Sequence, residues 1–457
     1  MQDRAADTDR RIFLMGAAAT AAAVSLPAAQ ASAKTVVQGS APVDAITMAA
    51  QIRKGDVTPL EALDATIARV EALPRLNAVV IKDYEQAREH AKKISTMGRD
   101  ARKQATGSAP LWGLPFVLKD LGVSMTGTVT TNGCAFFKDA VAKQDSTLVA
   151  RYKAAGLNIF GKTASPEFGM TATTESKLYG ATLNPWNTKH TTGGSSGGTA
   201  AAIAAGILPV GHATDGGGSI RIPAAHCGLF GLKPSRGRVP AGPNSLDGAT
   251  GLSVNHVISR SVRDTALLLD LTAGPEFGSR VRPPSDAPRG YLEAMQKPER
   301  KLRIAIWRKS YFGMPVHADC LAAVDKAAKA CEAMGHILEE AMPDLPVAEI
   351  FAGMGPGMSA GLLSSIEYRE KQLGRAVRED EMEPLNWAAL QAAKKATALE
   401  LYRGRAGFDK AGQLIDAFLS KYDLILTPTT AVPAQLLGAL RLDQPYQSYA
   451  AEAMNSS

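Results

Sequence analysis

Residues 191–223 read TTGGSSGGTAAAIAAGILPVGHATDGGGSIRIP, with two glycine-rich, serine-bearing loops on either side of an Ala-rich segment and a short apolar run. The pattern predicts a helix over residues 199–206 and a strand over residues 208–214. Glycine at this density carries an entropic cost, so we infer backbone conformations or close approaches that a side chain would prevent. This stretch is the densest functional signal in the chain.

The first loop has three other possible interpretations. Gly193 and Gly198 have the spacing of a phosphate-binding loop, but Thr199 stands where that loop needs a lysine. Residues 193–197 fit the Gly-x-Ser-x-Gly nucleophile elbow, yet the polar segment NPWNTKH at 184–190 precedes them instead of a buried strand. A flexible linker is disfavoured because both flanks are apolar and strongly patterned.

Strand-like and helix-like patterns alternate through the rest of the chain, which favours an α/β fold. Apolar runs at 114–123 and 157–161 flank a helical pattern at 145–156, and a second such unit comprises 302–307, 319–334 and 337–341. Residues 95–110 are predicted to form a loop. A long helical region at 384–420 is predicted to lead to residues 424–429, a buried strand that ends in a turn.

Composition and charge exclude several classes of protein. The chain has 457 residues, of which 45% are apolar and 21% charged, the balance of a globular protein with a large core. Its net charge of +7 is spread out, without the blocks of five or six basic residues expected of a nucleic-acid-binding arm. The four cysteines form no CxxC pair and have no zinc-ligand spacing, so neither a disulfide framework nor a structural metal site is expected.

The N-terminus has the layout of a bacterial export signal. The charged segment DRRIFL at 9–14 precedes an uncharged run at 15–26 and an Ala-x-Ala site at 31–33. The arginine pair resembles a twin-arginine signal, the alternative being an ordinary apolar helix. We expect a signal at 1–33, a mature domain at 34–457 located in the periplasm or secreted, and no stable insertion into a membrane.

Lys119 lies inside the apolar run LWGLPFVLKDL at 111–121. A lysine there must extend to solvent, pair with a carboxylate such as Asp120, or lose its proton as burial lowers its pKa. In the third case it can act as a general base near neutral pH. Taken alone, this segment leaves all three alternatives open.

Together, four segments resemble the amidase signature family of serine hydrolases. They are GLPFVLKD at 113–120, GGSSGG at 193–198, TDGGGSIRIP at 214–223 and CGLFGLKPSRGRV at 227–239. The resemblance implies an α/β fold consisting of a single α/β/α domain around a large mixed, mainly parallel β-sheet, without a cofactor or metal. It also implies a Ser-Ser-Lys triad in which Ser219 is the nucleophile, Ser195 carries the proton after a cis peptide bond, and Lys119 is the base.

The triad predicts hydrolysis of a small-molecule carboxylic amide through an acyl-enzyme, because a serine hydroxyl attacks well only after a base removes its proton. The N–H groups of Gly216, Gly217 and Gly218 are expected to bind the oxyanion. Two further residues, Ser196 and Arg221, are expected to support the loops, with Ser196 as an alternative nucleophile. The histidines at 212 and 226 are expected to be structural.

Residues 195–240 further resemble the group that includes 6-aminohexanoate cyclic dimer hydrolase. The rival hypotheses are the glutaminase subunit of a tRNA-dependent amidotransferase and a binding protein that retains the fold without activity. Family members usually continue past the strand ending at Pro428 with another core strand and a final helix, so this chain is expected to be truncated at its C-terminus. A homodimer is left open, and no nucleic-acid partner is expected.

Overall fold

A computed structural model describes residues 43–97, 99–243, 251–281, 283, 290–296 and 300–456. The predicted export signal at 1–33 lies outside these residues, so it stays a prediction. No helix in the described ranges is both long and apolar enough to cross a membrane.

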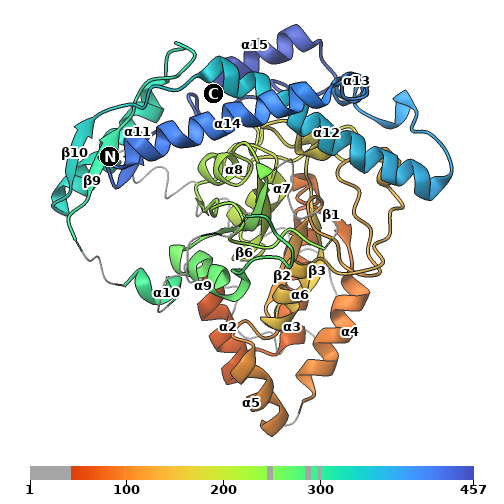
Figure 1. The fold of residues 1–457 in the computed structure, drawn as a ribbon. Helices are drawn as coiled ribbons and strands as arrows, with labels where there is room; N and C mark the ends of the chain where they lie inside the picture. Colours follow the sequence, from red (N-terminus) through yellow and green to blue (C-terminus); the bar gives the residue numbers. More distant parts are fainter. Residues whose placement is uncertain are drawn as a thin grey trace.

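Two three-stranded sheets lie side by side at the centre of the molecule (Figure 1). The first has the order β1–β3–β2, where β2 is parallel and β1 antiparallel to β3. The second has the order β6–β8–β7 and is antiparallel. The strands are β1 (Val79–Lys82), β2 (Pro115–Lys119), β3 (Asn158–Thr163), β6 (Val210–Asp215), β7 (Phe230–Gly231) and β8 (Val254–Ser259).

Helices cover both faces of these sheets. Successive side chains of a strand point to opposite faces, so an apolar strand can be fully buried only when both faces are covered. On β2, the side chains of Phe116 and Leu118 pack into a cluster with α2, α6 and α9, whereas Val117 packs into a cluster with α3, α7 and α8 on the other face. The helices of this core are α2 (Ala45–Lys54), α3 (Pro59–Ala72), α4 (Tyr84–Ser95), α5 (Arg99–Ser108), α6 (Thr147–Ala154), α7 (Gly197–Ala204), α8 (Arg221–His226), α9 (Val262–Thr272) and α10 (Tyr291–Ala294).

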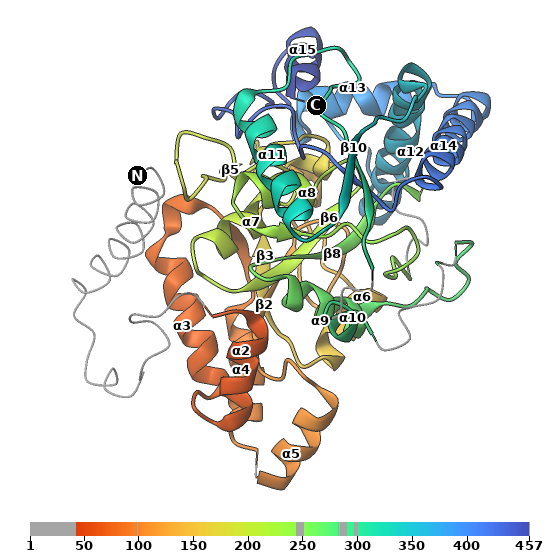
Figure 2. The ribbon, with the colours of Figure 1, turned by 90° about the vertical axis from the view of Figure 1, so that its left-hand side faces the viewer.

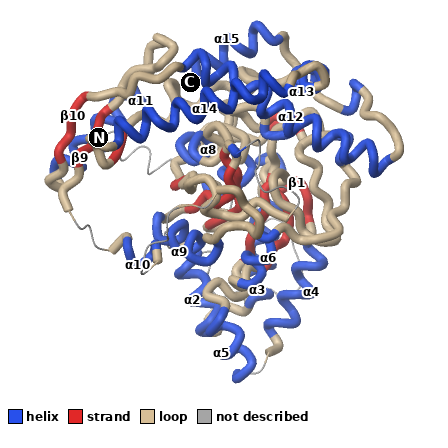
Figure 3. The backbone as a smooth tube through the Cα atoms, in the orientation of Figure 1, coloured by secondary structure: helices blue, strands red, loops and turns tan. Residues whose placement is uncertain are grey.

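The C-terminal half adds a smaller sheet and a layer of helices above the core (Figures 1 and 2). Figure 3 shows the small sheet at the side of the molecule, apart from the central strands; it is parallel, with the order β10–β9–β11. α12 and α14 cross where Gly353 contacts Gly404. The two backbones are so close that a Cβ on either residue would lie under 3 Å from the other's backbone, so the crossing requires glycine at both positions. These elements are β9 (Arg303–Ile306), α11 (Ala318–Ala333), β10 (Ile337–Glu340), α12 (Val347–Leu373), α13 (Pro384–Ala393), α14 (Ala398–Leu419), β11 (Leu424–Leu426) and α15 (Tyr446–Ser456).

Several expectations from the sequence need correction. Residues 95–110 contain the helix α5, which no apolar period marks because its residues are mainly polar. The region 384–420 forms two helices, and Leu424 of the predicted buried strand is 49% exposed, because β11 is the edge of a small sheet. Instead of one large, mainly parallel sheet, the described strands form separate sheets with both parallel and antiparallel pairs. Where β2 meets β6, the Lys119 N–H donates to the His212 ring instead of a backbone carbonyl.

Candidate active site

Lys119 is the last residue of β2, and strand alternation directs its side chain to the face that α7 covers. The side chain is fully buried. Its Nζ donates to Ser195 Oγ at 2.7 Å and to Thr214 Oγ1 at 2.8 Å. The structure thus brings together the lysine of one predicted segment and the first serine of another.

Burial lowers the pKa of Lys119 to about 7, although the nearby Asp215 carboxylate acts in the opposite direction. The carboxylate of Asp120 instead accepts the Thr131 N–H at 2.7 Å, so Lys119 and Asp120 form no pair. Of the three alternatives for Lys119, the structure therefore favours the desolvated lysine, which is partly neutral near neutral pH.

Ser195 and Ser196 lie in the tight loop that leads into α7. The peptide bond between Gly194 and Ser195 is cis, as the resemblance implied. The buried Ser196 hydroxyl donates to the Thr214 carbonyl and accepts the Thr214 N–H, both at 3.2 Å. This hydroxyl is therefore occupied in joining the loop to β6, which fits a supporting residue better than a nucleophile.

Ser219 is half-buried in the turn between β6 and α8. Its carbonyl accepts the Ser196 N–H at 3.2 Å, so the second glycine-rich loop packs directly on the first. All three predicted triad residues thus lie where these loops meet the end of β2.

The buried Asp215 carboxylate organises the turn that carries Ser219. It accepts the N–H groups of Gly218 at 2.7 Å and Ile220 at 3.2 Å, and the Arg221 guanidinium binds both of its oxygens, at 2.8 and 2.9 Å. Burial alone would raise the pKa of Asp215, but the bond and charge of Arg221 and these backbone donors keep it below its usual value. Arg221 therefore lies in the supporting position that the sequence suggested.

The hydrogen bond to Asp215 also affects the predicted oxyanion site. Because the Gly218 N–H is already bonded inside the turn, the structure does not support Gly218 as an oxyanion donor. Its φ of +119° and the 2.6 Å between a built Cβ and Ile222 Cδ1 explain the glycine instead. Among the described residues, the N–H groups of Gly216 and Gly217 have no hydrogen-bond partner.

The two histidines near the site have no contact that would make them a catalytic base. His212 accepts the Lys119 backbone N–H at 3.1 Å through Nδ1, while its Nε2 lies 3.2 Å from Asn255 Oδ1, and burial lowers its pKa to about 3. Burial also lowers the pKa of His226 to about 4, and its ring nitrogens have no hydrogen-bond partner among the described residues. Both rings are neutral at pH 7.

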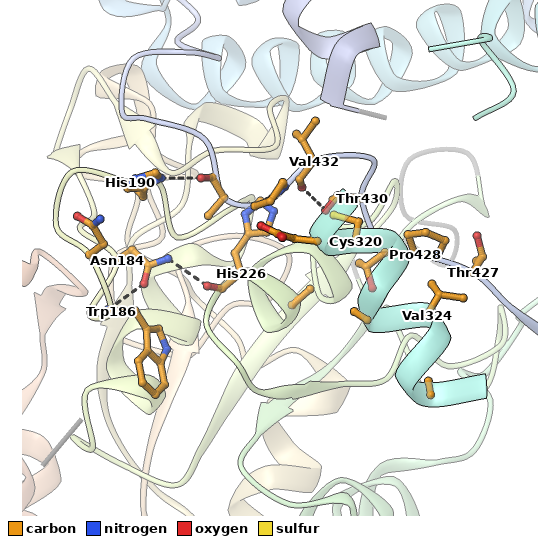
Figure 4. Close-up of a pocket in the computed structure, with 18 of the residues that line it drawn as sticks. Asn184, Trp186, His190, His226, Cys320, Val324, Thr427, Pro428, Thr430 and Val432 are labelled. Carbon is orange, nitrogen blue, oxygen red and sulfur yellow. Dashed lines mark hydrogen bonds between the residues drawn. The ribbon is translucent and has the colours of Figure 1, made fainter. Parts of the chain in front are cut away.

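A pocket of about 610 Å³ lies at the far end of α8 (Figure 4). His226 and Cys320 of α11 point toward each other across it, and the half-exposed Trp186 lines its rim. The triad residues do not line it; Ser219 lies two residues before the start of α8, whereas Ala225 and His226 at the other end of this helix line the pocket. Tyr179 lines a separate pocket of about 210 Å³.

Sequence reasoning missed the roles of Thr214 and Asp215 in this arrangement. An Asp ahead of Gly-Gly-Gly-Ser is a recognisable signal, because Asp side chains commonly accept N–H groups a few residues further on. Within the described ranges, no group of three or more His, Cys, Asp or Glu side chains could hold a metal ion.

The Amidase family model matches residues 61–456. The chain belongs to the amidase family. This match confirms the family that the sequence resembles and agrees with the predicted type of enzyme, and the solved structure of a family member described next confirms the α/β fold class.

Individual members of the amidase family show how close this likeness is. The chain is 34% identical over 410 residues to the 6-aminohexanoate-cyclic-dimer hydrolase of Paenarthrobacter ureafaciens, covering 87% of this chain and 80% of the relative. It is also 34% identical over 392 residues to a lipoamidase of Enterococcus faecalis, covering 85% of this chain and 50% of the relative. A solved structure of 6-aminohexanoate cyclic dimer hydrolase matches with a TM-score of 0.81 and 31% identity, over 90% of this chain and 86% of the other.

Proposed function

We propose that this amidase hydrolyses the C–N bond of a small-molecule carboxylic amide through an acyl-enzyme on Ser219. Ser195 relays the proton, and Lys119 is the base. The observation that carries the proposal is the fully buried Lys119 Nζ, 2.7 Å from Ser195 Oγ, with a pKa lowered to about 7.

The first chemical step is attack on the carbonyl carbon. The lone pair of neutral Lys119 accepts the Ser195 hydroxyl proton while Ser195 Oγ takes the proton of Ser219, whose oxygen forms the new C–O bond. The oxyanion that results is stabilised by the N–H groups of Gly216 and Gly217. One such donor is commonly worth about 3 kcal/mol in the transition state.

The second step is departure of the amine. Nitrogen leaves an amide poorly as an anion, so the Lys119 ammonium returns its proton through Ser195 to the nitrogen as the C–N bond breaks. A water molecule then attacks the Ser219 ester by the same relay. The products are a carboxylic acid and an amine, and each triad residue regains its starting protonation state.

Thr214 orients the base in this scheme. A neutral amine has two N–H donors and one lone pair, and the bond to Thr214 Oγ1 at 2.8 Å occupies one donor. With that donor fixed, the second N–H and the lone pair are the groups that can face Ser195 Oγ, and the amine accepts the Ser195 proton when its lone pair faces that oxygen. Thr214 is in turn held by the two bonds between its backbone and the Ser196 hydroxyl.

For the substrate, we propose linear or cyclic aliphatic amides. The support is the likeness to relatives named 6-aminohexanoate-cyclic-dimer hydrolase and lipoamidase, whose names specify such amides. The 6-aminohexanoate cyclic dimer and a linear aliphatic amide are therefore the first compounds to assay.

Kinetics of purified variants test the proposed roles. We expect Lys119→Ala, Ser195→Ala and Ser219→Ala each to lose at least about 100-fold in kcat, while Ser365→Ala on the exposed surface of α12 keeps wild-type rates. Mass spectrometry after treatment with a fluorophosphonate should place the label on Ser219. Wild-type turnover by Ser219→Ala would reject an acyl-enzyme on Ser219. If Ser219→Ala were active and the fluorophosphonate label lay on Ser195, the roles of nucleophile and proton carrier would have to be exchanged between the two serines.

A further inference from the structure

Next to the base, Asp120 and Lys162 form a second pair of buried charged residues that the proposed mechanism does not use. Lys162 on β3 aligns with Leu118, and Thr163 aligns with Lys119, so Lys162 lies on the sheet face opposite to Lys119. Neither Asp120 nor Lys162 is exposed to solvent. Buried charges are retained only when they are paired or hydrogen-bonded, so their partners indicate what they hold.

Both residues bind the same turn, at residues 129–133. One Asp120 oxygen accepts the Thr131 N–H at 2.7 Å, and the other accepts the Thr131 hydroxyl. Lys162 Nζ donates to the Val129 carbonyl and, at 2.6 Å, to Thr130 Oγ1. Two opposite charges thus fix consecutive residues of one turn.

This turn is locked against the segment that follows β3. The Phe168 N–H donates to the Asn132 carbonyl at 2.8 Å, and a Cβ built on Gly133 would lie 2.8 Å from the Ser165 carbonyl oxygen. Asn132 and Phe168 both have a positive φ, 54° and 50°, which is uncommon for non-glycine residues and most unusual for a bulky residue such as Phe168. The two turns therefore hold each other in unusual backbone conformations.

The turn that follows β3, at residues 165–169, contacts the proposed proton carrier Ser195 through Gly169. A Cβ built on Gly169 would lie 2.9 Å from Ser195 Oγ and 2.7 Å from Leu121 Cδ2. The backbone of Gly169 therefore packs directly on the hydroxyl that receives the Lys119 hydrogen bond. The segments between Asp120 and Ser195 are thus connected either by hydrogen bonds or by close backbone packing that leaves no space for a Cβ atom.

We propose that Asp120 is a positioning residue for Ser195, an inference that rests on the proposed function. Its carboxylate holds Thr131, which fixes the turn at Asn132, and the contact with Phe168 places Gly169 against the Ser195 hydroxyl. Lys162 balances the buried charge and holds the preceding residues of the turn. A displacement of about 1 Å in a reacting group can reduce the rate by about 100-fold, so this support affects turnover more than substrate binding.

Asp120→Asn is the first test, because its carbonyl can still accept the Thr131 N–H while its amide N–H cannot replace the second acceptor oxygen. We expect kcat to fall at least about tenfold with KM within about twofold of wild type. The matched control is Asp83→Asn, since Asp83 is also near Lys162 but forms no hydrogen bond with the described residues 129–133 of the turn. Asp83→Asn should therefore keep the wild-type kcat.

A pair of substitutions on Thr131 keeps the proposal testable even if Asp120→Asn fails to fold. Thr131→Ser preserves the N–H and the hydroxyl and should keep kcat within about twofold, whereas Thr131→Val loses the hydroxyl bond and should lower kcat several-fold. Equal kcat values for the two Thr131 variants would overturn the positioning role. A folded Asp120→Asn with wild-type kcat and a lower Tm, or with only KM raised, would also overturn it.

Wild type and Ser219→Ala belong in the same series of assays, because they separate the two proposals. An active Ser219→Ala would reject the acyl-enzyme itself. An inactive Ser219→Ala combined with a fully active Asp120→Asn would reject only the positioning role of Asp120.

Discussion

Ser195 and Ser196 are neighbours in the chain, yet their hydroxyl groups serve different partners. The Ser195 hydroxyl faces the Lys119 side chain at 2.7 Å, whereas the Ser196 hydroxyl bridges the carbonyl and N–H of Thr214. The first contact can move a proton between side chains, and the second joins two backbone segments. Substitutions of the two serines should therefore have different consequences.

Ser196→Ala should destabilise the protein more than it slows the reaction. It leaves the backbone N–H and carbonyl of Thr214 without their shared partner, and one unsatisfied buried group costs about 1–3 kcal/mol. We expect the free energy of unfolding to fall by about that amount and kcat to stay within about tenfold of wild type. Urea unfolding and initial rates measure both quantities, with Ser195→Ala as the comparison. Loss of all activity in Ser196→Ala beside an active Ser195→Ala would contradict the assignment.

The rate should depend on pH through Lys119. Burial lowers the pKa of this amine to about 7, and only its neutral form can accept the Ser195 proton. We expect kcat/KM to rise with pH up to about 7 and then level off, with a slope of about tenfold per pH unit on the acid side. Initial rates between pH 5 and pH 9 measure this profile. A rate that is highest at pH 5 would exclude Lys119 as the base.

Asp215→Asn should move that profile to lower pH. The Asp215 carboxylate raises the pKa of Lys119, so its neutralisation should lower that pKa and leave more neutral amine in acid. We also expect a lower kcat, because the turn around Ser219 loses its bidentate bond from Arg221. The control is Asp264→Asn, another buried aspartate, which accepts the Ala45 and Ile46 N–H groups. An unchanged midpoint in Asp215→Asn, or the same shift in Asp264→Asn, would refute the electrostatic link.

The sequence identifies the segments of the candidate site because their signals are local. Dense glycines near serines, and a lysine inside an apolar run, can be recognised without knowing what packs against them. The hydrogen-bond partner of Lys119 cannot be predicted in this way, since Asp120 is its neighbour in sequence but lies beyond the reach of its side chain. Strand alternation sends adjacent side chains to opposite faces, so the choice between Asp120 and Ser195 depends on a packing partner 76 residues away.

The parts of the fold that sequence patterns predicted poorly depend on contacts between distant segments or on surface helices. The polar helix α5 has no apolar period to reveal it. Glu167 accepts hydrogen bonds from Glu383 and Asn386, more than 200 residues later, and these bonds join the helical layer to the segment beside Ser195. Such contacts arise only once the layer formed by α12 and α13 has packed on the core.

This same contact makes the stability of the helical layer depend on pH. Glu383 precedes α13, and its carboxylate accepts the Lys177 N–H at 3.0 Å. Burial, together with the charge of nearby Glu167, raises the pKa of Glu383 from its ordinary value of 4.5 to about 7. Between these values the folded state binds more protons than the unfolded state, so the contribution to stability is present below about pH 4.5 and is lost as the pH rises through about 7.

Glu383→Gln should remove this loss, since glutamine keeps the acceptor for Lys177 and cannot ionise. We expect the free energy of unfolding of the variant, relative to wild type, to be higher at pH 8 than at pH 5, as measured by urea unfolding. Glu381→Gln is the matched control of opposite sign, because the hydrogen bond from Arg375 keeps the pKa of Glu381 at about 2 and its ionised form is stabilising at both pH values. That variant should be less stable than wild type at pH 8. If the Glu383→Gln protein instead lost stability relative to wild type as the pH rose, ionisation of Glu383 would not destabilise the folded state, and the prediction would be wrong.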